Sequence, residues 1–154
     1  MFLDGYAGSG AVGIEAVSRG ARQAILIEKN AQAVATIRKN VKALKIENEI
    51  IIVRGRVAAV VNDYKVDIAF IDPPYEEFKE YGVTLMALAA SRCPLVIAQH
   101  ASRTVLPDEY GALNRFRILR QGDNSLSFYE YAPESGSEKQ IDVHDIRSGG
   151  AGLD

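Results

Sequence analysis

Hydrophobic and polar positions along the chain fall into short blocks of two alternating kinds. Compact apolar runs predict strands at Met1–Asp4, Ala24–Glu28, Glu49–Val53, Val66–Ile71 and Leu95–Gln99. Runs that are apolar at consecutive positions are typical of parallel strands buried on both faces. Between these runs, apolar residues recur every three or four positions and predict helices at Ala11–Arg19, Ala31–Leu44, Val57–Val61 and Lys79–Ser91. Asn30 is the predicted N-cap of the second helix.

The last predicted strands follow each other without an intervening helix. Phe116–Leu119 and Leu126–Tyr131 predict an antiparallel hairpin around the turn Gln121-Gly122-Asp123-Asn124. The expected fold class is therefore α/β: a Rossmann-like, doubly wound, mostly parallel sheet with an antiparallel C-terminal hairpin. Residues 1–132 form the predicted core. Residues 133–154, which are mainly small, polar and charged, are expected to be a disordered polar tail.

Composition narrows the class of protein. With 154 residues, 47% hydrophobic and 25% charged, the chain has the size and balance of one globular domain. Its net charge of −2 argues against a uniformly basic surface for nucleic acid or membranes. One cysteine and two histidines give no disulfide framework and no basis for a metal centre. No apolar run approaches the roughly 18 residues of a membrane helix, and no signal peptide is visible, so a cytoplasmic location without a membrane partner is expected.

A glycine-rich segment follows the first predicted strand and opens the first helix. Asp4 is followed by Gly8, Gly10 and Gly13, at a place where glycine lets the backbone turn sharply and approach a ligand closely. The start of the helix adds unpaired N–H groups. By itself the pattern fits three structures: a cofactor loop, the dinucleotide fingerprint, or a tight turn without a ligand.

Glu28 ends the second predicted strand, about twenty residues after the glycines. A carboxylate at this place accepts hydrogen bonds from both hydroxyls of a ribose, in either NAD or S-adenosylmethionine. A single acid at a strand end is more often a solvated surface charge. Its spacing from the glycine segment favours the ribose.

The segment Asp72-Pro73-Pro74-Tyr75 follows a buried strand, at the edge of the sheet where open α/β folds bind ligands. The two prolines remove N–H donors and stiffen the loop. The Asp72 carboxylate and the Pro73 carbonyl then form acceptors for the two hydrogens of an exocyclic amine on a nucleobase. Tyr75 adds a ring that stacks on an extruded base, worth roughly 1–3 kcal/mol. A proline-rich turn with an incidental tyrosine is the structural alternative.

These segments resemble the class I S-adenosylmethionine-dependent methyltransferases and, more closely, the bacterial 16S ribosomal RNA guanine-N2 methyltransferase family. The resemblance spans residues 1–132. It rests on Phe2–Ala16 with Ser18–Ala21, on Ile27-Glu28-Lys29-Asn30, on Ile71–Tyr75 and on the final hairpin segment Gly122–Tyr129.

The resemblance implies a seven-stranded sheet whose last strand is antiparallel. It also implies S-adenosylmethionine as methyl donor, S-adenosylhomocysteine as product, no metal, and the N2 amine of a guanine in 16S rRNA as acceptor. The expected partner is ribosomal RNA or the small ribosomal subunit, bound by a monomer. The implied cofactor-binding residues are Asp4, Tyr6, Ala7, Gly8, Gly10, Glu28, Lys29 and Arg56. The implied catalytic residues are Asp72, Pro73, Pro74 and Tyr75.

Several alternatives stay open. The Asp-Pro-Pro-Tyr loop also fits methylation of adenine N6 or of another amine or amide, while a dehydrogenase would leave this loop unexplained. Because the chain starts at its first strand, it is expected to lack the family's N-terminal RNA-binding segment, and an inactive cofactor-binding remnant is the third hypothesis. Arg54 and Arg56 fit either RNA phosphates or a solvated edge, and Tyr6 fits either packing or a cofactor contact. His100 and Cys93 are expected to be structural.

Overall fold

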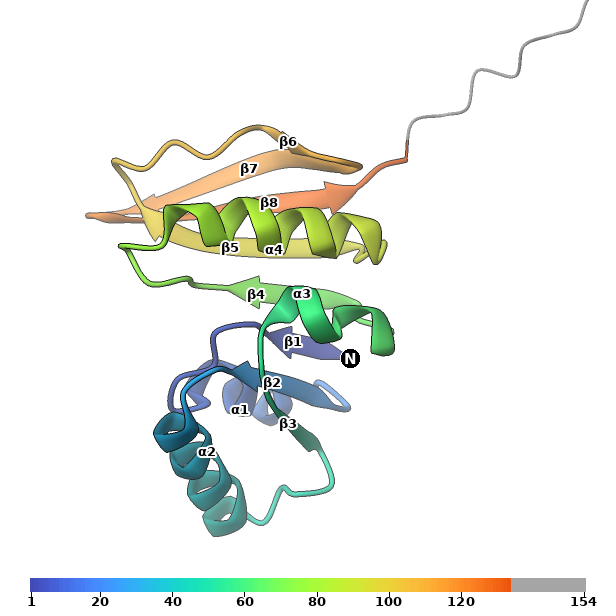
Figure 1. Cartoon of the computed structure of the whole chain (residues 1–154), viewed down its shortest axis with the longest axis vertical. Helices are drawn as coiled ribbons and strands as arrows, with labels where there is room; N and C mark the ends of the chain where they lie inside the picture. Colours follow the sequence, from blue (N-terminus) through green and yellow to red (C-terminus); the bar gives the residue numbers. More distant parts are fainter. Residues whose placement is uncertain (134–154) are drawn as a thin grey trace, which may run out of the picture.

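The structure, a computed structural model, describes residues 1–133, so the expectation of a disordered tail lies almost entirely outside the described residues. Strands and helices alternate through the first two thirds of the chain (Figure 1). The elements are β1 (Phe2–Asp4), α1 (Ala11–Ser18), β2 (Ala24–Glu28), α2 (Ala31–Leu44), β3 (Ile50–Arg54), α3 (Val57–Val60), a 3₁₀ turn (Val61–Asp63), β4 (Ile68–Ile71), α4 (Phe78–Ala90), β5 (Leu95–Ala101), β6 (Glu109–Tyr110), β7 (Leu113–Gln121) and β8 (Asn124–Tyr131).

All strands of residues 1–133 belong to one sheet in the order β3-β2-β1-β4-β5-β8-β7-β6. The first five strands of this order are parallel, and β8, β7 and β6 continue the sheet in antiparallel pairs. This arrangement confirms the predicted fold class. The sheet has eight strands where seven were expected, because the two-residue β6 pairs with β7. Its Tyr110 packs edge-on against Tyr129, a tertiary contact that no local apolar run announces.

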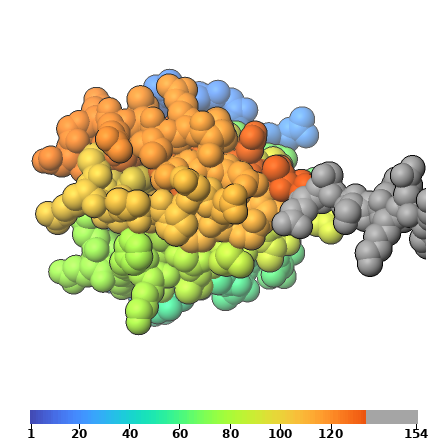
Figure 2. Space-filling view, turned by 90° about the horizontal axis from the view of Figure 1, so that it is seen from above, coloured from blue at the N-terminus to red at the C-terminus, as the bar shows by residue number. Residues whose placement is uncertain are grey.

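Helices cover the two faces unequally. The helices α3 and α4 bury the larger apolar core against β1, β2, β4, β5 and β8, whereas α1 and α2 bury a smaller core against β1, β2 and β3. Figure 2, viewed from the β6 end, shows orange residues of β7 at this end, with α4 in green along one side. On the opposite face, no helix of residues 1–133 covers β7, where Phe116 and Leu119 are exposed.

The strand order reverses between β1 and β4, the two neighbours from which the chain winds in opposite directions. In open α/β sheets, ligands bind outside the carboxyl ends of the strands at such a switch point. Three loops leave the sheet here: residues 5–10 after β1, residues 29–30 after β2 and residues 72–77 after β4. No helix in the described part of the chain has both the length and the apolar composition to cross a membrane.

Candidate functional site

A hollow of about 290 Å³ opens at this edge of the sheet, close to the lower end of the usual size range of ligand pockets. It is lined by Gly5, Tyr6, Gly8, Glu28, Lys29, Gly55, Arg56, Asp72, Pro73, Pro74, Tyr75 and Glu80. Most of the residues predicted from the sequence therefore surround one space. Gly5, Gly55 and Glu80 were not predicted. The predicted residues Asp4, Ala7 and Gly10 do not line the hollow.

The glycine loop owes its shape to backbone conformations that favour glycine. Gly8 and Gly10 have φ angles of 54° and 87°, in the left-handed region, and α1 begins directly after Gly10. No atom lies within 4 Å of the place where a Gly8 side chain would begin, so the loop leaves open space at this point. At Gly13, a Cβ atom would lie 2.4 Å from Leu26 Cδ1, so this glycine allows α1 to pack closely on β2.

Asp4 lies beneath the loop and is almost completely buried. Its carboxylate accepts the backbone N–H of Gly13 at 3.2 Å and lies near the backbone N–H of Tyr6. Burial raises the pKa of Asp4 to about 6, although these N–H groups lower it, and the nearby Asp72 and Glu28 carboxylates raise it further. Asp4 does not line the hollow, but it stabilises the glycine loop and the first turn of α1, which give the hollow its shape.

Glu28 joins the glycine loop to the end of β2. One carboxylate oxygen accepts the Gly8 N–H at 2.9 Å, and the other accepts the Asn30 N–H at 2.8 Å. Asn30 caps α2 as predicted, accepting the N–H groups of Gln32 and Ala33. Each Glu28 oxygen retains acceptor capacity, because a carboxylate has about four lone-pair sites. The acid is thus oriented by the backbone while it faces the hollow.

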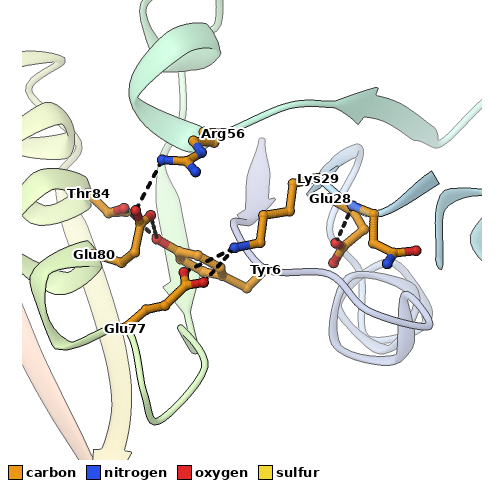
Figure 3. Close-up of polar contacts among 8 residues, drawn as sticks. Tyr6, Glu28, Lys29, Arg56, Glu77, Glu80 and Thr84 are labelled. Atoms are coloured by element: carbon orange, nitrogen blue, oxygen red, sulfur yellow. Dashed lines mark hydrogen bonds and ion pairs between the residues drawn. The ribbon is translucent and has the colours of Figure 1, made fainter. Parts of the chain in front are cut away.

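Two ion pairs connect the β2–β3 side of the hollow to α4 and the loop before it. Lys29 Nζ lies 2.8 Å from Glu77, and Arg56 Nη1 lies 3.3 Å from Glu80 (Figure 3). Both predicted cations therefore line the hollow with their charges paired. All four side chains are at least partly exposed, so each pair adds only about 0–1 kcal/mol to stability.

Tyr6 both packs and lines the hollow, so both of its predicted roles are compatible with the structure. Its hydroxyl lies 2.6 Å from Thr84 Oγ1 and donates to Glu80 at 3.2 Å (Figure 3). Burial raises the pKa of Tyr6 to about 12, so the phenol stays protonated. Glu80 and Thr84 are one helical turn apart on α4. The sequence signal for this pair was the presence of two polar residues, one helical turn apart, among the apolar residues Tyr81, Leu85 and Leu88, which the helix buries.

The Asp-Pro-Pro-Tyr loop is held at both ends by amide side chains, one on β5 and one at the start of β8. Gln99 Nε2, on β5, donates to Asp72 Oδ2 at 3.2 Å, and the Tyr75 hydroxyl donates to Asn124 Oδ1 at 2.8 Å. Burial raises the pKa of Asp72 above its usual value. The Tyr75 side chain remains 68% exposed, so its ring is anchored but accessible. Sequence reasoning missed Gln99, which it counted only as the end of a strand.

The remaining candidates lie outside the hollow. His100 is buried, with its ring nitrogens 2.8 Å from Ser127 Oγ and 2.9 Å from the Ala101 carbonyl oxygen. Cys93 is also buried, and burial raises its pKa to about 11. The Arg54 side chain contacts the Lys29 carbonyl oxygen at 3.4 Å. Across residues 1–133, no group of three or more His, Cys, Asp or Glu residues lies together as a metal site would require.

The parallel strands in the order β3-β2-β1-β4-β5, continued by the antiparallel β8 and β7, with the glycine loop after β1 and the acid that ends β2, have the arrangement of the class I methyltransferase fold. The chain belongs to the family described as Conserved hypothetical protein 95, whose family model matches residues 1–130.

Named relatives agree with this assignment. Ribosomal RNA small subunit methyltransferase D of Buchnera aphidicola is 42% identical over 77 residues, which are 49% of this chain and 40% of the relative. A Bacillus subtilis protein, provisionally named an rRNA methyltransferase, is 28% identical over 136 residues, 83% of this chain and 74% of the relative. The expected resemblance to rRNA methyltransferases is thereby confirmed.

A solved structure extends the match in three dimensions. The Streptococcus pyogenes structure, described as a conserved hypothetical protein, has a TM-score of 0.74 and 32% identity, and the match covers 84% of each chain.

Proposed function

We propose that the chain transfers a methyl group from S-adenosylmethionine to the exocyclic N2 amine of a guanine in small-subunit ribosomal RNA. One observation carries the proposal: Glu28 and the Asp-Pro-Pro-Tyr loop line the same hollow at the switch point of the sheet. The Glu28 carboxylate can accept hydrogen bonds from the hydroxyls of a ribose. The Asp-Pro-Pro-Tyr loop can accept the hydrogens of an exocyclic amine on a nucleobase. The names of the relatives support ribosomal RNA as the substrate class.

The lining of the hollow fits the proposed cofactor. Glu28 keeps free lone pairs for the two ribose hydroxyls, and the open space at Gly8 lets a ligand approach the backbone closely. The carboxylates of Glu28, Asp72 and Glu80 give the hollow acceptors that favour a cationic sulfonium. S-adenosylmethionine would supply an electrophilic methyl group here, and S-adenosylhomocysteine would remain after transfer.

The acceptor side depends on Asp72 and Pro73. The guanine amine is a weak nucleophile, because its lone pair is delocalised into the ring. Acceptance of its two hydrogens by the Asp72 carboxylate and the Pro73 carbonyl favours a pyramidal nitrogen, and a hydrogen bond to a charged group contributes roughly 1.5–3 kcal/mol. As the new N–C bond forms and the S–C bond breaks, the amine becomes acidic and loses a proton to Asp72 or water. Tyr75 holds the base by stacking, so positioning supplies most of the rate.

Two other functions differ in the product that they form. Methylation of adenine N6 or another amine uses the same loop, and the aspartate at its first position favours guanine. A cofactor-binding protein without transferase activity would bind S-adenosylhomocysteine and methylate nothing. Cytoplasmic location, a monomeric state and small ribosomal subunits as partner belong to the proposal for an rRNA enzyme.

The test uses methyl-tritiated S-adenosylmethionine with naked 16S rRNA and with small ribosomal subunits, followed by digestion to nucleosides. The proposal expects label in N2-methylguanosine, and Asp72→Ala should lower transfer by at least about tenfold while S-adenosylhomocysteine still binds. Label in N6-methyladenosine would replace the proposed acceptor. Cofactor binding without transfer to either RNA would support the binding protein.

A further inference from the structure

A second hollow, of about 370 Å³, lies next to the proposed acceptor site and shares Tyr75 with the first. It is lined by Tyr75, Ala101, Ser102, Arg103 and Asp123. These residues come from the loop after β4, from the last residue of β5 with the two residues that follow it, and from the turn between β7 and β8. The proposed chemistry uses only one of them, Tyr75.

The wall of this second hollow is cross-linked by hydrogen bonds. Ser102 donates its backbone N–H to the Asp123 carbonyl oxygen at 2.8 Å. The Ser102 hydroxyl donates to the Gly122 carbonyl oxygen at 3.1 Å and lies 2.8 Å from Ser125 Oγ. The end of β5 is therefore tied to the β7–β8 turn. The hollow is built into the fold before any ligand arrives.

Tyr75 lines both hollows and is held in place between them. Its hydroxyl is bound by Asn124, the first residue after the same β7–β8 turn, so the ring stays beside both spaces. A base that stacks on this ring carries its sugar and phosphate away from the reacting amine. The second hollow adjoins the same ring.

The charges of the second hollow distinguish a phosphate from other ligands. Arg103 is exposed and is the cation of the lining. Among the described residues it forms no ion pair, including with Asp123, which lines the same space. A guanidinium presents five donors in a planar fork that matches phosphate oxygens. The negative charge of Asp123 repels an anion. Arg103 should therefore strengthen the binding of a phosphate and Asp123 should weaken it.

We infer that the second hollow binds the sugar–phosphate backbone of the acceptor RNA next to the methylated base, with Arg103 contacting a phosphate. This inference rests on the proposed function. It adds an RNA subsite on the antiparallel half of the sheet, opposite the side that Glu28 assigns to the cofactor.

The test is equilibrium binding of the chain to a labelled 16S rRNA fragment by fluorescence anisotropy, in the presence of S-adenosylhomocysteine and over a series of KCl concentrations. Arg103→Gln should weaken binding about three- to tenfold at low salt and lower the slope of log K against log salt by about one. Asp123→Asn should strengthen binding. Arg22→Gln is the matched control, since Arg22 is exposed before β2 at the opposite edge of the sheet.

The outcomes separate the inference from the function on which it rests. In transfer assays, Arg103→Gln should raise KM for RNA and leave kcat and S-adenosylhomocysteine affinity unchanged. If the wild type binds and methylates RNA while Arg103→Gln behaves like the wild type or like Arg22→Gln, the inference is wrong and the proposed function stands. If the wild type neither binds nor methylates RNA, both are wrong.

Discussion

Glu28 and Gly8 lie 20 residues apart in the chain, and the Glu28 carboxylate accepts the Gly8 N–H at 2.9 Å. The bond joins two sequence motifs that were interpreted separately, the glycine loop and the acid at the end of β2. Glu28 therefore has two effects in the structure: it holds the loop that shapes the hollow, and it faces the hollow with unused lone pairs.

Removal of this carboxylate should weaken cofactor binding. We expect Glu28→Ala to raise the Kd of S-adenosylhomocysteine by at least about tenfold, which corresponds to about 1.4 kcal/mol. Glu28→Gln should have a smaller effect, because its amide oxygen still accepts hydrogen bonds without the charge. Isothermal titration calorimetry measures both. Glu15→Ala, an exposed site on α1, is the control and should leave Kd unchanged. Equal affinities of Glu28→Ala and wild type would contradict the assignment.

The contact between Gln99 and Asp72 predicts a change in the pH dependence of methyl transfer. Gln99→Glu would place a second carboxylate against Asp72 and raise its pKa further, because like charges disfavour ionisation. Asp72 also faces Asp4 on β1 and Tyr81 on α4, and both remain in the variant. Since the proposed mechanism requires the ionised Asp72 carboxylate, the acid limb of the kcat profile should move to higher pH.

The measurement is kcat against pH for the wild type and three variants. Gln99→Leu should also move the acid limb upward, because it removes the N–H donor that favours the charged form. Gln32→Glu, the same change in the exposed first turn of α2, should leave the profile unmoved. An effect of Gln99→Glu that is uniform at every pH would mean that Gln99 is only structural.

Asp4 predicts a pH-dependent stability. Its pKa of about 6 lies above the usual 3.8, so the folded state holds the proton more tightly than the unfolded state. Protonation therefore stabilises the fold at low pH, and this contribution is lost as the pH rises from about 4 to about 6. Asp4→Asn removes the ionisation and keeps an acceptor for the Gly13 N–H.

The difference in free energy of unfolding between wild type and Asp4→Asn should shift by up to about 3 kcal/mol between pH 4 and pH 7, in favour of the variant at the higher pH. Urea unfolding at several pH values provides this difference. Asp63→Asn, the same substitution at an exposed position, is the control. A constant difference for Asp4→Asn would show that Asp4 has an ordinary pKa.

Two helical glycines should respond to alanine with opposite signs. At Gly13 a Cβ would lie 2.4 Å from the buried Leu26, so Gly13→Ala should destabilise the protein by about 1–3 kcal/mol. At Gly82, within α4, no atom lies within 4 Å, and alanine should stabilise by about 0.5–1 kcal/mol through helix propensity. Thermal or urea unfolding distinguishes the two. Destabilisation by both variants would mean that backbone effects, not the Leu26 contact, decide the result.

Much of the parallel half of the sheet could be predicted from the sequence, because each strand is a continuous apolar run and each helix repeats its buried positions every three or four residues. The bounds of β2 and α2 agree with the prediction, the latter because Asn30 marks the helix start. The short β6 could not be predicted. Its two residues depend on the packing of Tyr110 against Tyr129, which local patterns do not contain.

The residues of the candidate site also fall into those that could be predicted from the sequence and those that could not. Residues within contiguous motifs, such as Glu28 and Asp72, could be predicted because their places at strand ends follow from the order of the elements. Their partners could not. Glu80 meets Tyr6 across 74 residues, and Asn124, expected as part of a turn, begins β8 and accepts from Tyr75 across 49 residues. These pairings depend on how α4 and the hairpin lie over the sheet.

The hydrogen bond between Tyr75 and Asn124 affects the entropy of recognition. A side chain that becomes immobilised on binding costs about 0.5–1.5 kcal/mol. Because its hydroxyl is already tethered, the Tyr75 ring has lost much of this freedom in the unliganded protein, although its faces are exposed. A flat ligand that stacks on the ring thus meets a preorganised surface, and more of the stacking energy remains as affinity.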